Sequence, residues 1–275
     1  MLLSEGPSPQ APDVSAEPLG RIERVAGDRW ERFAQEDAEF YVYSRKDIDF
    51  STPEGQKEFW ASGVRISEAI LREVGPHIHR LETALEIGAG IGRIAIPMAR
   101  TFAHVVAIDI SPTMVIKLQE HARDFQITNI EALLSGEPWE SRGPFDLVYS
   151  KRVFRHIVDW AVISDYIERI ALSLSPDGVA WLEFDSRPPS MAYAVRNLVP
   201  DALLPRTQKR GIRGVRRPRS ELLSLFERSA LLLMEEFRPG TKDQVFVLVT
   251  RPAGDAAKRR RGSKQPSSRP PSTTG

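Results

Sequence analysis

The 275-residue sequence contains no cysteine, which excludes disulfide bonds, a cysteine nucleophile and thiolate metal sites. It also lacks an apolar run of the roughly 18 residues that a membrane-spanning helix needs. Residues 1–20 lack the basic and apolar regions of a secretory signal. No His-x-Glu or paired-carboxylate pattern typical of a metal site is present. We therefore expect a cytoplasmic protein with no membrane span and no bound metal.

An excess of positive over negative charge is confined to two short segments. The chain has a net charge of +1, but residues 251–275 hold seven Lys or Arg and one Asp, which leaves residues 1–250 at −5. The second basic segment, residues 206–219, holds seven Lys or Arg and no acid. This distribution does not favour a general nucleic-acid-binding surface.

Composition divides the chain into four parts. Residues 1–20 are rich in Pro, Ser, Ala and Glu, residues 252–275 are rich in Lys, Arg, Pro and Ser, and both are predicted to be disordered. Residues 21–80 have a helical, aromatic pattern that predicts a helical cap. Its aromatic residues either only pack on the rest of the chain or also close over a ligand site, as Trp30, Tyr41 or Tyr43 could do. Residues 81–251 make up the main domain.

The main domain alternates short apolar strands with amphipathic helices, which predicts a doubly wound α/β fold with a mostly parallel sheet. Residues 186–219 interrupt this pattern with prolines and form an insertion after the fifth strand. The last two strands are predicted to form an antiparallel β-hairpin. The predicted strands are residues 84–87, 105–109, 130–134, 145–150, 179–184, 231–237 and 244–250. The predicted helices are residues 91–102, 112–123, 160–174 and, with Ser220 as its cap, a helix that ends near residue 229.

Residues 83–93, with the sequence TALEIGAGIGR, organise the main domain. A short strand ends at Ile87, glycines follow at every second position, and a helical pattern begins at Ile91. A strand, a glycine turn and a helix N-terminus make a cradle for a nucleotide-like ligand. Glycine permits tight backbone angles and close approach of the ligand to the main chain. The dinucleotide fingerprint G-x-G-x-x-G is absent, because Arg93 stands at its third glycine position.

The glycine spacing G-x-G-x-G, with Glu86 two residues before it and Asp109 at the end of the next strand, resembles class I S-adenosylmethionine-dependent methyltransferases. The resemblance covers about residues 70–251. It implies a seven-stranded, mostly parallel sheet with a C-terminal antiparallel β-hairpin and an N-terminal helical cap. It also implies S-adenosyl-L-methionine as the methyl donor.

The resemblance further implies which residues bind the donor. Glu86 would meet the donor's ammonium group. Asp109 lies 21 positions after the first glycine, close to the spacing expected for an acid that accepts both ribose hydroxyls. Ile110 and Met114 match positions that flank the adenine, while Met114 also suits a helix core. The segment after the third strand resembles the family's Gly-Asp-Ala, but has Glu and Pro at its last two positions. The expected donor site is Glu86, Gly88, Ala89, Gly90, Gly92, Asp109, Ile110, Met114, Gly136, Glu137 and Ser150.

Methyl transfer from a sulfonium is an in-line displacement, so the protein mainly positions the donor and acceptor and, for some acceptors, removes a proton. His156, after the fourth strand, is the candidate catalytic base because imidazole titrates near neutral pH. Alternatively, it only forms hydrogen bonds in the wall of the site. Residues 150–153 lack the Asn/Asp-Pro-Pro-aromatic sequence found in enzymes that methylate adenine or glutamine amino groups. The absence of cysteine excludes cytosine C5 methylation.

Three functions stay open at this point. The first is an O- or N-directed methyltransferase for a small, anionic acceptor bound by insertion residues Arg213, Arg216 and Arg217. These arginines could instead pair with acids of their own domain. The second is a nucleic-acid- or ribosome-directed methyltransferase that uses the basic segments for binding, although the tail could equally only keep the protein soluble. The third is a protein that binds S-adenosylmethionine without transferring its methyl group.

Overall fold

The computed structural model describes residues 17–43, 45, 47–188, 190–200, 203–204 and 214–250. Residues 1–16 and 252–275, which include most of the segments predicted to be disordered, lie outside this described part. Helix α1 (Glu17–Tyr43) begins within the segment 1–20, so the helical cap starts earlier than predicted. None of the helices in the described ranges has the length and apolar composition needed to cross a membrane.

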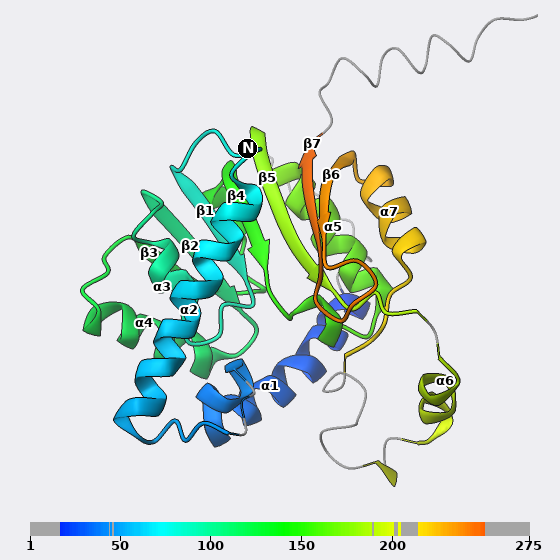
Figure 1. Ribbon diagram of the computed structural model, residues 1–275, viewed down its shortest axis with the longest axis horizontal. Helices are drawn as coiled ribbons and strands as arrows, with labels where there is room; N and C mark the ends of the chain where they lie inside the picture. Colours follow the sequence, from blue (N-terminus) through cyan, green and yellow to red (C-terminus); the bar gives the residue numbers. More distant parts are fainter. Residues whose placement is uncertain are drawn as a thin grey trace, which may run out of the picture.

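A seven-stranded sheet with the order β3-β2-β1-β4-β5-β7-β6 forms the centre of the molecule (Figure 1). Strands β1 to β5 pair in parallel, and β7 runs antiparallel to both β5 and β6. This arrangement confirms the predicted doubly wound sheet with its closing hairpin. The strands are β1 (Thr83–Ile87), β2 (His104–Asp109), β3 (Ile130–Leu134), β4 (Phe145–Ser150), β5 (Leu174–Phe184), β6 (Leu231–Phe237) and β7 (Gln244–Thr250).

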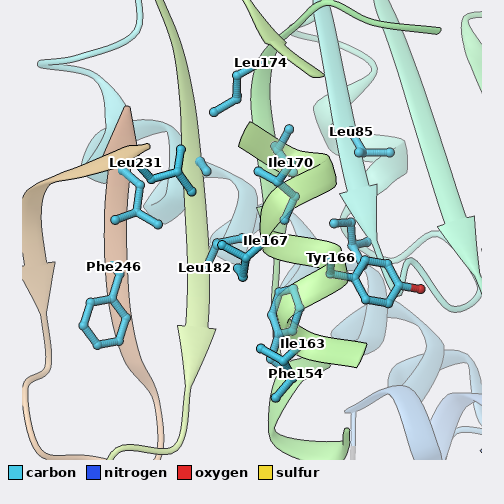
Figure 2. Close-up of a cluster of buried hydrophobic side chains, with 14 of the residues drawn as sticks. Leu85, Phe154, Ile163, Tyr166, Ile167, Ile170, Leu174, Leu182, Leu231 and Phe246 are labelled. Atoms are coloured by element: carbon cyan, nitrogen blue, oxygen red, sulfur yellow. The ribbon is translucent and has the colours of Figure 1, made fainter. Parts of the chain in front are cut away.

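Helices cover both faces of the sheet. Successive residues of a strand point to opposite faces, so Leu85 packs on one side with residues of α5 and α7, and Ala84 on the other with residues of α2 and α3. Figure 2 shows the first cluster, where Ile163, Ile167 and Ile170 of α5 lie against the sheet. The helices are α2 (Pro53–Val74), α3 (Ala95–Met98), α4 (Pro112–Asp124), α5 (Trp160–Ser173), α6 (Met191–Leu198) and α7 (Arg219–Arg228).

Helices α1 and α2 form the N-terminal cap, and α1 lies at the end of the sheet where the parallel strands finish (Figure 1). Glu31 fixes α1 to the start of α4, because its carboxylate accepts hydrogen bonds from the Ser111 hydroxyl at 2.6 Å and from the Thr113 N–H at 3.1 Å. Burial acts to raise the pKa of Glu31, but these hydrogen bonds hold it below its ordinary value. Met114 of α4 and Phe59 of α2 share one buried cluster with residues of α1. The cap is therefore packed directly on the main domain.

The predicted helix of residues 91–102 is wrong in its extent. Only residues Ala95–Met98 form a regular helix, α3. Gly92 has a left-handed backbone with a φ of 89°, which no helix interior adopts. Pro97 lacks the N–H that would donate to the preceding turn. The chain after the glycine turn therefore continues as a set of short turns around one helical segment.

The predicted cap of the last helix is also wrong. Helix α7 begins directly after Pro218, so Ser220 lies inside it and caps nothing. The fifth strand, predicted at residues 179–184, is longer in the structure, because β5 begins at Leu174 and its first part pairs irregularly with β4. Within the insertion, α6 stands apart from the sheet at the lower right of Figure 1.

Candidate functional site

A cavity of about 310 Å³ lies at the carboxyl ends of β1, β2 and β4. The strand order reverses direction between β1 and β4, and doubly wound folds bind ligands in the crevice at such a point. One part of the lining comes from the glycine turn and the residues that follow β2. The other part comes from α1 and from the segment that follows β4. The glycine turn and the segment after β4 therefore face one common space.

The three glycines of the turn all have left-handed backbones, with φ values of 76° at Gly88, 56° at Gly90 and 89° at Gly92. The N–H of Gly88 donates to a main-chain carbonyl of β2 at 2.8 Å and holds the turn against that strand. A Cβ atom at Gly88 would lie 2.1 Å from a methyl group of Val153, and one at Gly90 would lie 2.7 Å from a methyl group of Val42. The glycines thus allow the segment after β4 and helix α1 to approach the turn. Gly88 and Gly90 line the cavity, whereas Gly92 does not.

Asp109 ends β2 and contributes to the cavity wall. Its Oδ2 accepts from the N–H of Gly90 at 2.8 Å, and its Oδ1 accepts from the N–H of Ser111 at 3.0 Å. Burial raises the pKa of the Asp109 carboxyl, while these N–H groups act in the opposite direction. A carboxylate has about four acceptor positions, so Asp109 can hold the turn and still accept hydrogen bonds from a ligand.

Glu86 and Arg93 are neighbouring buried charged groups on the β1 side of the cavity. The Tyr149 hydroxyl donates to Glu86 Oε2 at 3.1 Å, because the two residues are direct partners in the β1–β4 register. Burial raises the pKa of Glu86 to about 8, although Tyr149 and Arg93 oppose this shift. Burial also lowers the pKa of Arg93 to about 10, with the charge of Glu86 acting in the opposite direction. Glu86 can therefore change its charge near neutral pH when a ligand changes its surroundings.

Three further predicted donor residues, Ala89, Ile110 and Met114, line the cavity. Met114 is only 3% exposed, because it also packs against the cap helices. Met114 therefore belongs both to the cavity wall and to the core, and its contact with the adenine stays a prediction.

Three other predicted donor residues lie outside the cavity lining. Gly136 and Glu137 are exposed, and the preceding Ser135 lines the cavity in their place. The Glu137 carboxylate accepts from a main-chain N–H at the end of β3 at 2.8 Å, so it stabilises that turn. Ser150 is fully buried, and its hydroxyl donates to a carbonyl of β1 at 3.0 Å. These three residues lie beside the cavity and do not line it.

His156 lies in a short 3₁₀ helix (Phe154–His156) and lines the cavity. Its ring meets that of Trp30 edge to face, with the ring centres 5.2 Å apart. Trp30 and Tyr41 of α1 also line the cavity, but Tyr43 does not. The aromatic residues of the cap therefore both pack on the domain and close over the site.

The segment after β4 is held by buried ion pairs. Lys151 Nζ lies 2.7 Å from Glu183 Oε2, and Arg155 pairs with both Glu183 and Asp243. Glu183 is fully buried. Burial lowers the pKa of Lys151, while the charge of Glu183 acts in the opposite direction. Lys151 and the adjacent Arg152 line the cavity, so cationic side chains stand opposite the glycine turn.

Of the insertion arginines predicted to bind the acceptor, Arg216 and Arg217 do not line the cavity. Arg213 lies outside the described residues. The Arg216 guanidinium donates to a main-chain carbonyl of the insertion at 2.7 Å and lies 4.4 Å from the centre of the Tyr193 ring. Arg217 donates to the carbonyl of Ile157 at 3.1 Å. The structure thus gives no support to acceptor binding by Arg216 or Arg217, because their guanidinium groups are engaged by their own chain.

We expect Arg217→Ala to lower the free energy of unfolding by about 1–3 kcal/mol, because charge-assisted hydrogen bonds to the segment that carries Ile157 are lost. The measurement is thermal unfolding. The matched control is Arg219→Ala, which removes a half-exposed pair with Glu236 and should cost no more than about 1 kcal/mol. Unchanged stability of the Arg217→Ala chain, together with a raised KM for the acceptor, would show that Arg217 binds the acceptor after all.

Several residues that line the cavity are absent from the site predicted from the sequence: Arg29, Arg93, Lys151, Arg152, Val153 and Tyr166. The sequence does mark Lys151, Arg152 and Val153, because they stand between the predicted site residues Ser150 and His156. Arg29 and Tyr166 lie on helices, and no pattern in the sequence marks the helix face that meets the cavity.

Comparisons with known proteins show which sequences and folds this chain is similar to. Residues 84–178 match a family model described as a methyltransferase domain. The ubiquinone biosynthesis O-methyltransferase of Xylella fastidiosa is 33% identical over 87 residues, which cover 30% of this chain and 34% of that protein. A protein of the same name from Rhodopseudomonas palustris is 24% identical over 185 residues, which cover 65% of each chain. The first curated relatives are thus matched over only about a third of their length, 34% and 36%.

Two solved structures share the fold. Magnesium protoporphyrin IX methyltransferase from Synechocystis PCC 6803, with bound SAH, has a TM-score of 0.58 at 16% identity and covers 83% of this chain and 99% of its own. An S-adenosylmethionine-dependent methyltransferase from Clostridium acetobutylicum has a TM-score of 0.55 at 12% identity, covering 82% of this chain and 100% of its own. At sequence identities this low, the similarity to these two structures shows a shared fold and nothing more.

Proposed function

We propose that this chain, whose residues 84–178 match a family model described as a methyltransferase domain, transfers a methyl group from S-adenosyl-L-methionine to an oxygen or nitrogen of a small-molecule acceptor. One observation carries the proposal. A single cavity joins the glycine turn, Glu86 and Asp109 to a second region lined by Trp30, Lys151 and His156. Such a cavity can hold a donor and an acceptor side by side.

The residues of the cavity fit the parts of the donor. Asp109 offers a carboxylate for the ribose hydroxyls, and Glu86 offers a carboxyl group for the ammonium. Ile110 and Met114 offer apolar surface for the adenine. When bound, the donor supplies a methyl group carried on a sulfonium. The chain's own residues hold the donor, exclude water beneath α1 and position the acceptor.

We expect donor binding to release protons at neutral pH. Glu86 is mostly protonated in the free protein below about pH 8, and an ammonium beside it would favour the ionised carboxylate. S-adenosylhomocysteine, the demethylated donor, carries the same amino group. Its affinity for the chain should therefore rise as the pH approaches 8 from below. Calorimetry in two buffers with different protonation enthalpies measures the released protons.

The control for this experiment is Glu137→Gln, which alters a carboxylate outside the cavity. It should bind and release protons as the unaltered chain does. The Glu86→Gln chain should bind S-adenosylhomocysteine more weakly and should release no protons when it does so. Proton release that persists in Glu86→Gln would show that another group titrates.

His156 is proposed as the proton acceptor when the methyl group goes to a hydroxyl or an amine. It lines the cavity, and its contact with Trp30 sets the orientation of its ring. The general chemistry of imidazole supports the role, since it takes up a proton near neutral pH.

The acceptor is proposed to carry negative charge. Two carboxyl groups line the cavity together with four cationic side chains, Arg29, Arg93, Lys151 and Arg152. The donor adds one net positive charge, because its sulfonium and ammonium outweigh its carboxylate. The charged groups of the cavity and the donor together are positive on balance, which favours an anionic over a cationic acceptor. This support comes from the cavity wall and not from the insertion arginines.

The nucleic-acid alternative finds no support in the relatives, whose names refer to small molecules. Residues 206–213 and the basic tail, on which that alternative depends, lie outside the described residues. A cytoplasmic location is part of the proposal and is supported by the absence of cysteine.

The test is incubation of the chain with methyl-labelled donor and a cell extract separated into metabolite, protein and nucleic-acid fractions. The proposal predicts label in the metabolite fraction. Label that enters only nucleic acid would favour the alternative, and donor that binds without losing its methyl group would favour a binding protein.

A further inference from the structure

We propose that Arg152 binds a carboxylate group on the acceptor, so that the acceptor class is a carboxylic acid with an apolar body. This inference rests on the proposed function and names the residue that selects the substrate. Arg152 lines the cavity directly after β4, on the side opposite Asp109.

The segment that carries Arg152 is fixed on both sides of it. Lys151 is paired with Glu183, and Arg155 is paired with Glu183 and Asp243. The side chain of Val153 fills the space left by the missing Cβ of Gly88. Arg152 is therefore held at the cavity by neighbours whose own charges and volumes are already satisfied.

Arg152 itself differs from these neighbours. Its φ is 64°, a left-handed conformation that an arginine rarely adopts and that tends to mark functional sites. Its Nε is shielded from solvent without a hydrogen-bond partner. Within the described part of the chain, no carboxylate forms an ion pair with it, and its charge acts unfavourably on Lys151 and Arg93. A strained and unpaired guanidinium facing a cavity is suited to a ligand that is an anion.

The shape of the guanidinium indicates the kind of anion. Its planar fork can donate two parallel hydrogen bonds to the two oxygens of a carboxylate. The surrounding wall supplies apolar surface from Trp30, Val162 and Tyr166. A carboxylate attached to an apolar or aromatic body satisfies both features.

The position of Arg152 favours the acceptor over the donor as the source of that carboxylate. In the strand order β2-β1-β4-β5, Asp109 ends β2 and Glu86 lies in β1, whereas Arg152 follows β4. The charge of Arg152 also lowers the pKa of Asp243, which lies near the start of β7 beyond β5. Arg152 thus follows a strand on the far side of β1 from Asp109, the proposed acceptor of the ribose hydroxyls.

The experiment uses two probes of nearly the same shape, 2-naphthoate and neutral 2-naphthamide, titrated by fluorescence into the full chain saturated with S-adenosylhomocysteine. We expect 2-naphthoate to bind about tenfold tighter or more, as one charge-assisted hydrogen-bond pair would give. In Arg152→Asn this preference should disappear, while affinity for S-adenosylhomocysteine stays within about twofold. Asparagine tolerates the left-handed backbone, so the segment should keep its conformation.

Arg142→Asn is the matched control, because Arg142 is half-exposed, pairs with Glu131 and lies outside the cavity lining. It should keep the full preference for 2-naphthoate, and Arg152→Lys should keep part of it. Equal binding of the two probes by the unaltered chain, or no binding of either, overturns the inference. Loss of S-adenosylhomocysteine affinity in Arg152→Asn also overturns it and assigns Arg152 to the donor's carboxylate. Failure of the unaltered chain to bind S-adenosylhomocysteine would instead remove the proposed function itself.

Discussion

Replacing Asp109 by alanine is expected to weaken donor binding by about 2–3 kcal/mol, which is tens-fold or more in affinity. Two losses add together. The donor's ribose hydroxyls lose their proposed acceptor, and the N–H groups of Gly90 and Ser111 lose the carboxylate that now holds them at 2.8 and 3.0 Å. The second loss loosens the glycine turn and the start of α4 at the same time.

Titration calorimetry with S-adenosylhomocysteine measures this effect. Asp109→Asn should fall between the alanine variant and the unaltered chain, because one of its two terminal atoms still accepts a hydrogen bond. Asp124→Ala, at the exposed end of α4, serves as the control and should bind normally. Unchanged affinity in Asp109→Ala would remove Asp109 from the donor site.

Replacing Gly90 by valine is expected to abolish measurable donor binding while the domain still folds. A β-branched residue resists the left-handed φ of 56° that the turn requires. Its Cβ would also lie 2.7 Å from a methyl group of Val42, so α1 would have to move away from the cavity. This one substitution therefore disturbs both the glycine turn and the part of the cavity wall that α1 provides.

Gly136→Val is the matched control for Gly90→Val. A Cβ atom at Gly136 would have no atom within 4 Å, and Gly136 has no left-handed φ, so a side chain there meets open space. Circular dichroism establishes folding, and calorimetry establishes donor affinity. Normal donor affinity in a folded Gly90→Val chain would show that Gly90 has only a structural role in the turn.

Much of the fold could be predicted because the strands carry a strong local signal. The bounds predicted for residues 130–134, 145–150, 231–237 and 244–250 coincide with those of β3, β4, β6 and β7. Each of these runs is apolar or alternating and is bounded by turn residues, so neighbouring segments scarcely compete with it. The glycine spacing and the acid at the end of β2 likewise belong to local sequence, and Gly88, Gly90 and Asp109 do meet at one cavity.

The remainder of the site depends on contacts between distant segments. The pair of Lys151 with Glu183 joins residues that follow β4 and lie in β5, and no local pattern connects them. Arg93 was noticed only as the residue that breaks a dinucleotide fingerprint, yet it is a buried neighbour of Glu86. The prediction for Arg216 and Arg217 rests on composition, which cannot show that their guanidinium groups already donate to the main chain.

A crystal structure of the chain with S-adenosylhomocysteine would show whether the cavity is the donor site. We expect the ligand in the cavity beneath α1, with its ribose hydroxyls on Asp109 and its amino group at Glu86. Its sulfur should face the region lined by Trp30, Lys151 and His156. A ligand bound elsewhere, or bound with its ribose away from Asp109, would contradict the account.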